Sequence, residues 1–278
     1  MTEALVLGGG GVAGVAWTTG LLTGLADAGH DVSGAGLIVG TSAGSTVAAQ
    51  LGSGLGWEDL YTRQIDPALQ AAEIMAEVDL AHLGSGIAAA VRGATSAVEI
   101  RRAVGRLALA AETVPERERR AVIESRLPSH EWSARAVKIV AVDAESGEPR
   151  VFDSTSGVSL VDAVAASCAV PGVWPPVTVG GHRYIDGGVR SHLNADYAAG
   201  ASRILVVAPL GQTSMLPSEK PFAQTLAELR AGGSEVAVVE PDEASRLAIG
   251  ANALDPATRG PAAEAGRVQG RGLTIEWT

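Results

Sequence analysis

A serine stands between two glycines in the segment GTSAG at residues 40–44, which fits the spacing G-x-S-x-G. A strand-like apolar run precedes this segment and an alanine-rich, helix-like run follows it. In that setting the serine occupies a sharp strand-to-helix turn, where its hydroxyl projects above the sheet. Gly40 and Gly44 would let the neighbouring backbone approach closely, and the free amides at the helix start would face the reacting oxygen. The motif therefore predicts that Ser42 is a nucleophile for acyl transfer.

A run of four glycines, Gly8 to Gly11, allows two interpretations. Gly9, Gly11 and Gly14 fit G-x-G-x-x-G, which between a strand and a helix is the fingerprint of dinucleotide binding. Such a site also needs an acidic residue at the end of the second strand to bind the ribose, and residues 39–42 include none. The missing acid favours a hydrolase, and a Rossmann-type dinucleotide-binding protein remains the alternative.

In a hydrolase the glycine run would stabilise the oxyanion that forms during acyl transfer. Consecutive glycines can turn their amides toward the reacting oxygen without side chains in the way. Each amide donor of this kind contributes about 10²–10³ in rate. We expect Gly9, Gly10 and Gly11 to be these donors, because the first two strands of the sheet would place them beside Ser42.

Ser42 needs a general base, and the sequence offers both histidines and an aspartate. An α/β-hydrolase triad places its histidine after the acid, so His182 and His192 remain candidates among the five histidines. Asp186 follows an apolar strand-like run and precedes two glycines in YIDGGV, which lets the backbone come close. Asp186 is the stronger candidate, because its carboxylate could take the proton of Ser42 directly, without an imidazole between them.

Four segments in this order, GGGGVAG, GTSAG, ASCAVPGVWPPV and DGG, resemble the patatin-like phospholipase family over residues 4–210. The resemblance implies an α/β/α sandwich and hydrolysis of fatty-acyl esters in phospholipids, lysophospholipids or neutral lipids. It implies a dyad of Ser42 and Asp186 in place of a triad, an oxyanion loop at residues 9–11, and neither a metal nor a cofactor. One position departs from the family, because Ala13 stands where its members usually carry Arg or Lys.

The segment ASCAVPGVWPPV is expected to pack beside the dyad, on a path that its three prolines fix. Trp174 within it is predicted either to line the acyl site or to pack in the core. Cys168 is expected to be a small buried residue, since no base accompanies it in the sequence.

Strands and helices alternate along the chain, which predicts a three-layer α/β/α sandwich with a mainly parallel central sheet. Strands are expected at Ala4–Leu7, Leu37–Val39, Val137–Val142, Arg150–Phe152, Arg183–Ile185, Ile204–Ala208 and Val236–Val239. Helices are expected at Val12–Ala28, Ala43–Leu51, Ala68–Val78, Ser96–Ala111, Leu160–Ser167 and Pro256–Gln269.

We expect residues 4–278 to form a single domain. A helical insertion at about residues 57–130 would cap the sheet edge, and a polar helical tail would occupy about residues 242–278. The charged run Pro115–Arg120 is expected to form a solvated helix face.

Composition excludes several classes of protein. The 278 residues carry 31 acidic and 21 basic side chains, and the formal net charge of −10 disfavours binding to nucleic acid. A single cysteine allows neither a disulfide framework nor a cysteine metal site. Residues 4–26 are uncharged, but seven glycines interrupt them and no basic segment precedes them, so we expect neither a membrane span nor a signal peptide. The sequence therefore predicts a cytoplasmic protein.

These observations together predict a serine acyl hydrolase for a lipid or acyl-ester substrate, with transient contact to a membrane surface. A carboxylesterase or thioesterase of small acyl substrates uses the same chemistry and remains an alternative. A lipid-binding protein without catalytic activity is another.

Overall fold

The structure is a computed structural model that describes residues 2–75, 80–213, 216–217 and 220–278. The strands are β1 Glu3–Leu7, β2 Leu37–Thr41, β3 Ala136–Asp143, β4 Pro149–Phe152, β5 Val177–Val179, β6 His182–Asp186, β7 Arg203–Val207 and β8 Glu235–Val239. The α-helices are α1 Gly11–Asp27, α2 Ala43–Leu51, α3 Trp57–Ile65, α4 Leu80–Ala90, α5 Ala97–Ala110, α6 Glu116–Arg126, α7 Leu160–Ser167, α8 Phe222–Ala231, α9 Glu243–Ile249 and α10 Arg259–Gly272. Short 3₁₀ turns are η1 Gly187–Val189, η2 Ala195–Ala198 and η3 Pro256–Thr258.

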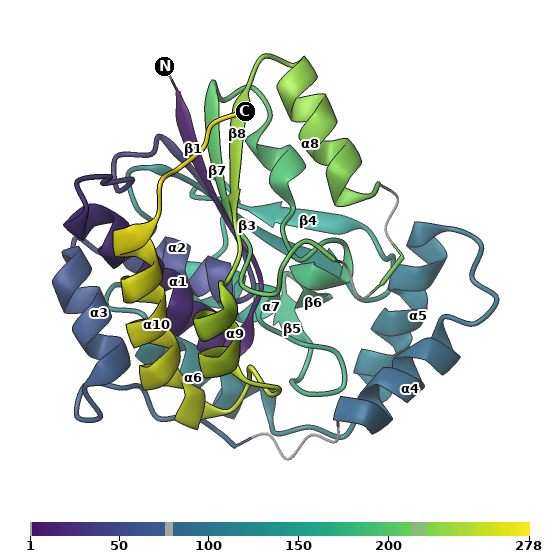
Figure 1. The fold of residues 1–278 in the computed structure, drawn as a ribbon. Coiled ribbons are helices and arrows are strands. Elements are labelled where there is room, and N and C mark those ends of the chain that lie inside the picture. The colour runs from purple at the N-terminus through teal and green to yellow at the C-terminus, as the bar shows by residue number, and fades with distance from the viewer. Residues whose placement is uncertain (1, 76–79, 214–215, 218–219) are drawn as a thin grey trace.

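One sheet contains all of these strands, and helices cover both of its faces (Figure 1). The strand order is β5-β6-β3-β2-β1-β7-β8, and β4 pairs with β3 outside that path. The strands β3, β2, β1, β7 and β8 pair in parallel with their neighbours in this order. β4 and β6 each pair with β3 in the antiparallel orientation, and β5 pairs with β6 in the antiparallel orientation. The predicted fold, a mainly parallel sheet between helical layers, is confirmed.

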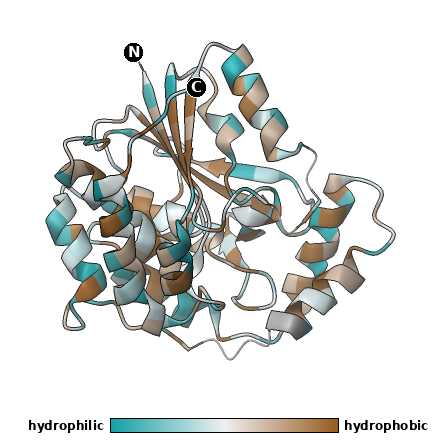
Figure 2. Cartoon of the chain, viewed as in Figure 1, coloured by the Kyte–Doolittle hydropathy of each residue, from teal (hydrophilic) through white to brown (hydrophobic). Residues whose placement is uncertain are grey.

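The central strands are buried on both faces, which explains why they are continuous apolar runs in the sequence. Leu5 and Leu7 of β1 face a core that includes side chains of α1, α2, α7 and α10. Ala4 and Val6 of the same strand face a second core with side chains of α8 and η2. Figure 2 shows the result as hydrophobic strands at the centre and hydrophilic residues toward the outside.

The C-terminal helix α10 lies directly on α1, the helix that follows the glycine run (Figure 1). A Cβ added to Gly266 of α10 would lie 2.4 Å from the backbone oxygen of Trp17. A Cβ added to Gly20 of α1 would lie 2.0 Å from the backbone oxygen of Ala263. The two backbones are thus too close for a side chain at these contacts, and α10 packs against the core with its small residues.

Replacing Gly266 with alanine is expected to destabilise the protein by about 1–3 kcal/mol, as overpacking does. Without a clash, alanine would stabilise the helix by about 1 kcal/mol relative to glycine. A net loss of stability would therefore show that the backbones of α1 and α10 are in close contact. Gly260→Ala in the same helix is the matched control, because a Cβ there meets no atom within 4 Å. Urea denaturation measures both variants, and equal or higher stability of Gly266→Ala would contradict the close packing.

The segment between α2 and β3 holds helices α3 to α6 and, among its described residues, no strand. These helices pack in different places: α3 lies beside α1 and α10, whereas α6 lies beside α7. The helix predicted at Ala68–Val78 is wrong for residues 68–75, which are irregular, and residues 76–78 lie outside the described part of the chain. The irregular stretch is bound from elsewhere in the fold, for example by Arg259, which donates to the backbone oxygen of Ala71 at 3.2 Å.

Candidate active site

Ser42 occupies the turn between β2 and α2 in a conformation that side-chain-bearing residues rarely adopt, with φ 52° and ψ −118°. Two glycines allow this turn to pack. A Cβ on Gly44 would lie 1.9 Å from the backbone oxygen of Leu7, and a Cβ on Gly40 would lie 2.7 Å from the backbone oxygen of Gly44. Strain held in this way by the surrounding packing is typical of a functional turn.

Residues at the end of α7 hold the backbone of Ser42 in place. The Ser42 N–H donates to Ser167 Oγ at 2.9 Å, and Ser167 Oγ donates to the backbone oxygen of Val140 at 2.6 Å. Cys168 Sγ donates to the backbone oxygen of Ser42 at 3.2 Å. Cys168 is buried as predicted, and burial raises the pKa of its thiol, so it stays protonated. The segment that begins at Ser167 therefore supports the turn.

Asp186 ends β6, where it pairs with Ala141 of the adjacent strand β3. Its carboxylate accepts a hydrogen bond from the Gly188 N–H at 2.7 Å, and the Ser42 side chain lies close enough to favour its ionised form. Burial raises the pKa of Asp186 to about 6, although Ser42 and the Gly188 N–H oppose the rise. A carboxylate with this pKa is ionised at neutral pH and is a stronger base than an exposed aspartate. The structure thus brings Ser42 and Asp186 together.

The rings of the two candidate histidines, His182 and His192, have partners other than Ser42. His182 Nδ1 lies 3.0 Å from Asp143 Oδ2, and its side chain is 64% exposed. His192 Nε2 lies 2.8 Å from the backbone oxygen of Gly211, and burial lowers the pKa of this ring. Asp186 is therefore the candidate base for Ser42.

The glycine loop lies beside this turn, because the Gly44 N–H donates to the backbone oxygen of Gly8 at 3.0 Å. The prediction for Gly9 needs correction: its N–H donates to the backbone oxygen of His192 at 2.8 Å and is not available to an oxyanion. Within the described part of the chain, the amides of Gly10, Gly11 and Ala43 donate to no protein acceptor. These three amides begin α1 and α2, so both helix N-termini offer free donors near Ser42.

A small pocket opens at Ser42. Its apolar side includes Val12, Val170, Trp174 and Leu254. Trp174 was predicted for either the acyl site or the core; it lines this pocket and is 5% exposed. The free space is about 20 Å³, room for about one water molecule, so an acyl chain needs side chains to move.

The polar side of the pocket was not predicted from the sequence. It includes Glu73, Arg119 and Arg126. The expectation that residues 115–120 form a solvated face is wrong for Arg119, whose side chain is 7% exposed. Arg119, Ile123 and Arg126 follow helical spacing of four and three, and this spacing was the available signal for a buried face.

Fold and site define an α/β protein with a strained serine at a strand-to-helix turn, beside a buried aspartate. A profile of the family described as Patatin-like phospholipase matches residues 5–199. The chain therefore belongs to the patatin-like phospholipase family.

Similar solved structures are more distant. VipD from Legionella pneumophila is 13% identical with a TM-score of 0.47, and the match covers 97% of this chain and 66% of that one. The type III effector ExoU is 16% identical with a TM-score of 0.38, covering 100% of this chain and 54% of that one. A complex of full-length SpcU with full-length ExoU from Pseudomonas aeruginosa gives 18% identity and a TM-score of 0.37, with coverage of 100% and 54%. This chain thus spans between 54% and 66% of their length. A search of the curated proteins found no match.

Proposed function

We propose that the protein is a serine acyl hydrolase that cleaves fatty-acyl esters of lipids through Ser42, Asp186 and an acyl-enzyme. The observation that carries the proposal is the buried Asp186 carboxylate beside the strained turn that presents Ser42. The family description, Patatin-like phospholipase, supports the same activity. The hydrolase unit is taken to be one domain over residues 4–278, and its cytoplasmic location remains a prediction from the sequence.

In the first half-reaction, Asp186 accepts the hydroxyl proton as Ser42 Oγ attacks the ester carbonyl carbon. The amides of Gly10, Gly11 and Ala43 stabilise the negative charge that develops on the carbonyl oxygen. The bond to the leaving alcohol then breaks, and Asp186 returns the proton to that alcohol. In the second half-reaction Asp186 takes a proton from water, which attacks the acyl-enzyme. Ser42 recovers the proton and the fatty acid leaves.

Contact with a lipid surface would follow from the residues around Glu73. Leu69 and Met75 flank it in the sequence and are 45% and 66% exposed. Such side chains favour a transient apolar contact over a charged one, which also fits the net charge of −10. No helix among the described residues has the length and apolar character needed to cross a bilayer.

Hydrolysis of p-nitrophenyl esters of increasing acyl length tests the proposal. We expect kcat/KM to rise with chain length, because the apolar wall formed by Val12, Trp174 and Leu254 contacts longer chains, at about 0.8 kcal/mol per buried methylene. Ser42→Ala should abolish turnover at every length. A maximum at acetyl or butyryl would favour the small-ester alternative. Turnover that survives in Ser42→Ala would contradict the proposed nucleophile.

A further inference from the structure

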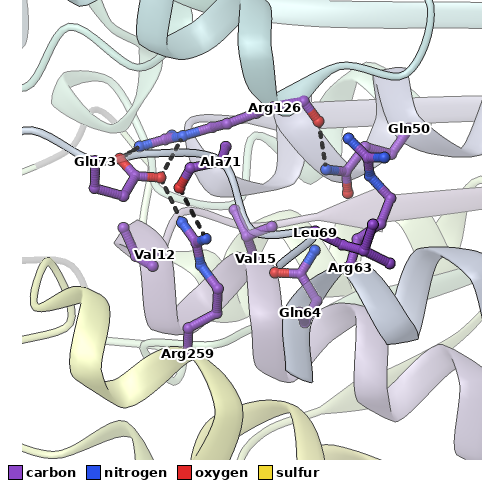
Figure 3. A pocket seen from close by; sticks show the side chains of 10 residues that line it. All are labelled: Val12, Val15, Gln50, Arg63, Gln64, Leu69, Ala71, Glu73, Arg126 and Arg259. Atoms are coloured by element: carbon purple, nitrogen blue, oxygen red, sulfur yellow. Dashed lines mark hydrogen bonds and ion pairs between the residues drawn. The ribbon is translucent and has the colours of Figure 1, made fainter. Parts of the chain in front are cut away.

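One buried carboxylate, that of Glu73, is shared by three arginines beside the proposed active site, and Figure 3 shows two of them, Arg126 and Arg259. Arg126 Nε donates to Glu73 Oε1 at 2.9 Å, and its Nη2 pairs with Oε2 at 2.5 Å. Arg259 Nη2 pairs with Oε1 at 2.5 Å, and Arg119 Nη1 lies 3.7 Å from Oε2. The four side chains are between 4% and 10% exposed. One negative charge therefore faces three positive charges in the protein interior.

Arg119 is the least satisfied member of this cluster. Its Nε and Nη1 are buried and make no hydrogen bond within the described chain. Its guanidinium carbon lies over the Trp174 ring, 3.8 Å from the ring centroid, in a cation–π contact. Burial, together with the charge of Arg126, lowers the pKa of Arg119 to about 9. A buried guanidinium without hydrogen-bond acceptors is costly, so a purely structural role explains this arrangement poorly.

The cluster lies at the boundary between two cavities. Arg119, Arg126 and Glu73 line the pocket that contains Ser42. Glu73 and Arg126 also line a neighbouring cavity together with Arg259, as Figure 3 shows. The sequences of α1 and α2 contain neither lysine nor arginine. Positive charge thus reaches the Ser42 pocket from α6, and Arg259 of α10 adds to it from the neighbouring cavity; both helices lie far from the glycine loop in the sequence.

We infer that Arg119, Arg126 and Arg259 form an anion-binding subsite that selects acyl esters carrying a phosphate group near the scissile ester. In the present conformation the carboxylate of Glu73 occupies part of this subsite as an internal counter-ion. Arginine suits the role because its planar fork pairs with phosphate oxygens through two parallel hydrogen bonds. The inference rests on the proposed function for the ester chemistry, while the anion site itself rests on the four side chains.

A matched pair of lipids tests the subsite: 1-palmitoylglycerol 3-phosphate and neutral 1-palmitoylglycerol, each presented in the same neutral detergent micelles. The wild-type ratio of kcat/KM, phosphate over neutral, is expected to exceed about 10, as for one charge-assisted pair. Arg119→Met should lower this ratio at least tenfold, and Arg119→Lys should restore part of it. Arg117→Met is the control on the same helix, since the Arg117 side chain is 87% exposed.

Melting temperatures distinguish a binding role of Arg119 from a structural one. Because the Arg119 guanidinium is buried without hydrogen bonds at Nε and Nη1, Arg119→Met should melt at the same temperature as wild type or higher. Glu73→Gln should melt lower in phosphate-free buffer and should regain stability when inorganic phosphate is added. A lower melting temperature of Arg119→Met, with an unchanged lipid ratio, would overturn the inference.

Inorganic phosphate also identifies the source of the anion. Inhibition of p-nitrophenyl ester hydrolysis by millimolar phosphate, lost in Arg119→Met, supports a site that accepts the free ion. A lipid preference without such inhibition supports a site specific for the headgroup. Absence of both effects overturns the subsite. If wild type hydrolyses no ester, the proposed function fails, and calorimetric binding of 1-palmitoylglycerol 3-phosphate to Ser42→Ala, compared with Ser42→Ala/Arg119→Met, still decides the anion site.

Discussion

Ser42→Ala is expected to lower kcat/KM for any cleaved ester by at least about 10⁴, since the loss of a serine nucleophile removes the covalent route. Asp186 and the free amides of Gly10, Gly11 and Ala43 would remain in place, but no oxygen would be positioned to attack the carbonyl. Folding should change little, because the interactions that hold residue 42 use its backbone N–H and oxygen. Steady-state kinetics and a thermal melt measure the two quantities.

Ser125→Ala is the control for Ser42→Ala. Ser125 lies exposed on α6, and its hydroxyl donates to the backbone oxygen of Val122. We expect its activity to stay within about twofold of wild type, as for surface substitutions generally. A Ser42→Ala variant that keeps a tenth of the wild-type rate would show that another group is the nucleophile.

Asp186→Asn is expected to lower kcat by about 10⁴, the loss seen when the aspartate of a serine triad is converted to an amide. The amide still fits between Ser42 and the Gly188 N–H, but it has no lone pair basic enough to take a proton. In wild type, kcat/KM should rise as the pH passes through about 6, because the Asp186 carboxylate must be ionised to act as a base. That limb of the pH profile should vanish in Asp186→Asn.

The free energy of unfolding should also depend on the ionisation of Asp186, but it should fall as the pH rises, whereas kcat/KM rises. The folded pKa of Asp186, about 6, exceeds the value of 3.8 for an unperturbed aspartate, so the folded state binds the proton more tightly. Stability is therefore lost as the pH rises between these two values. Above pH 6 the loss is at most about 3 kcal/mol, at about 1.4 kcal/mol per pKa unit. Asp186→Asn should accordingly be more stable than wild type at pH 8, and the difference should shrink toward pH 4.

His182→Ala serves as the control for Asp186→Asn. The His182 ring is exposed and pairs with Asp143 rather than with the site, so its replacement should leave the pH limb near 6 in place. A wild-type pH profile in Asp186→Asn, or loss of the limb in His182→Ala, would exclude Asp186 as the base.

Local patterns in the sequence predicted most of the sheet and the helices that flank the site. The bounds of α2 and α7 agree with the prediction at both ends, and α7 begins after Ser159, whose hydroxyl accepts from the Asp162 N–H as an N-cap. β5 and α8 were missed, because a three-residue strand and a short helix of mixed polarity give weak periodicity, whereas α9 lies within the helical tail expected at about residues 242–278. The helix expected at Ala68–Val78 failed, because distant arginines bind this stretch in an irregular form.

Some residues of the site could be predicted from the sequence, and others could not. Ser42, its flanking glycines and Asp186 lie in short segments whose residue types reveal their chemistry. The partner of the Gly9 amide was not predictable, because it is the backbone oxygen of His192, far along the chain. Glu73 and Arg259 were not predictable either, because their ion pair joins residues 186 positions apart and neither belongs to a motif.

The most direct measurement is covalent labelling with a long-chain alkyl fluorophosphonate, followed by mass spectrometry of the digested protein. We expect one adduct, on the peptide that contains Ser42, with labelling that slows in Asp186→Asn and is absent in Ser42→Ala. An adduct on a different residue, or labelling that persists in Ser42→Ala, would contradict the assignment of Ser42 as the acyl-accepting nucleophile.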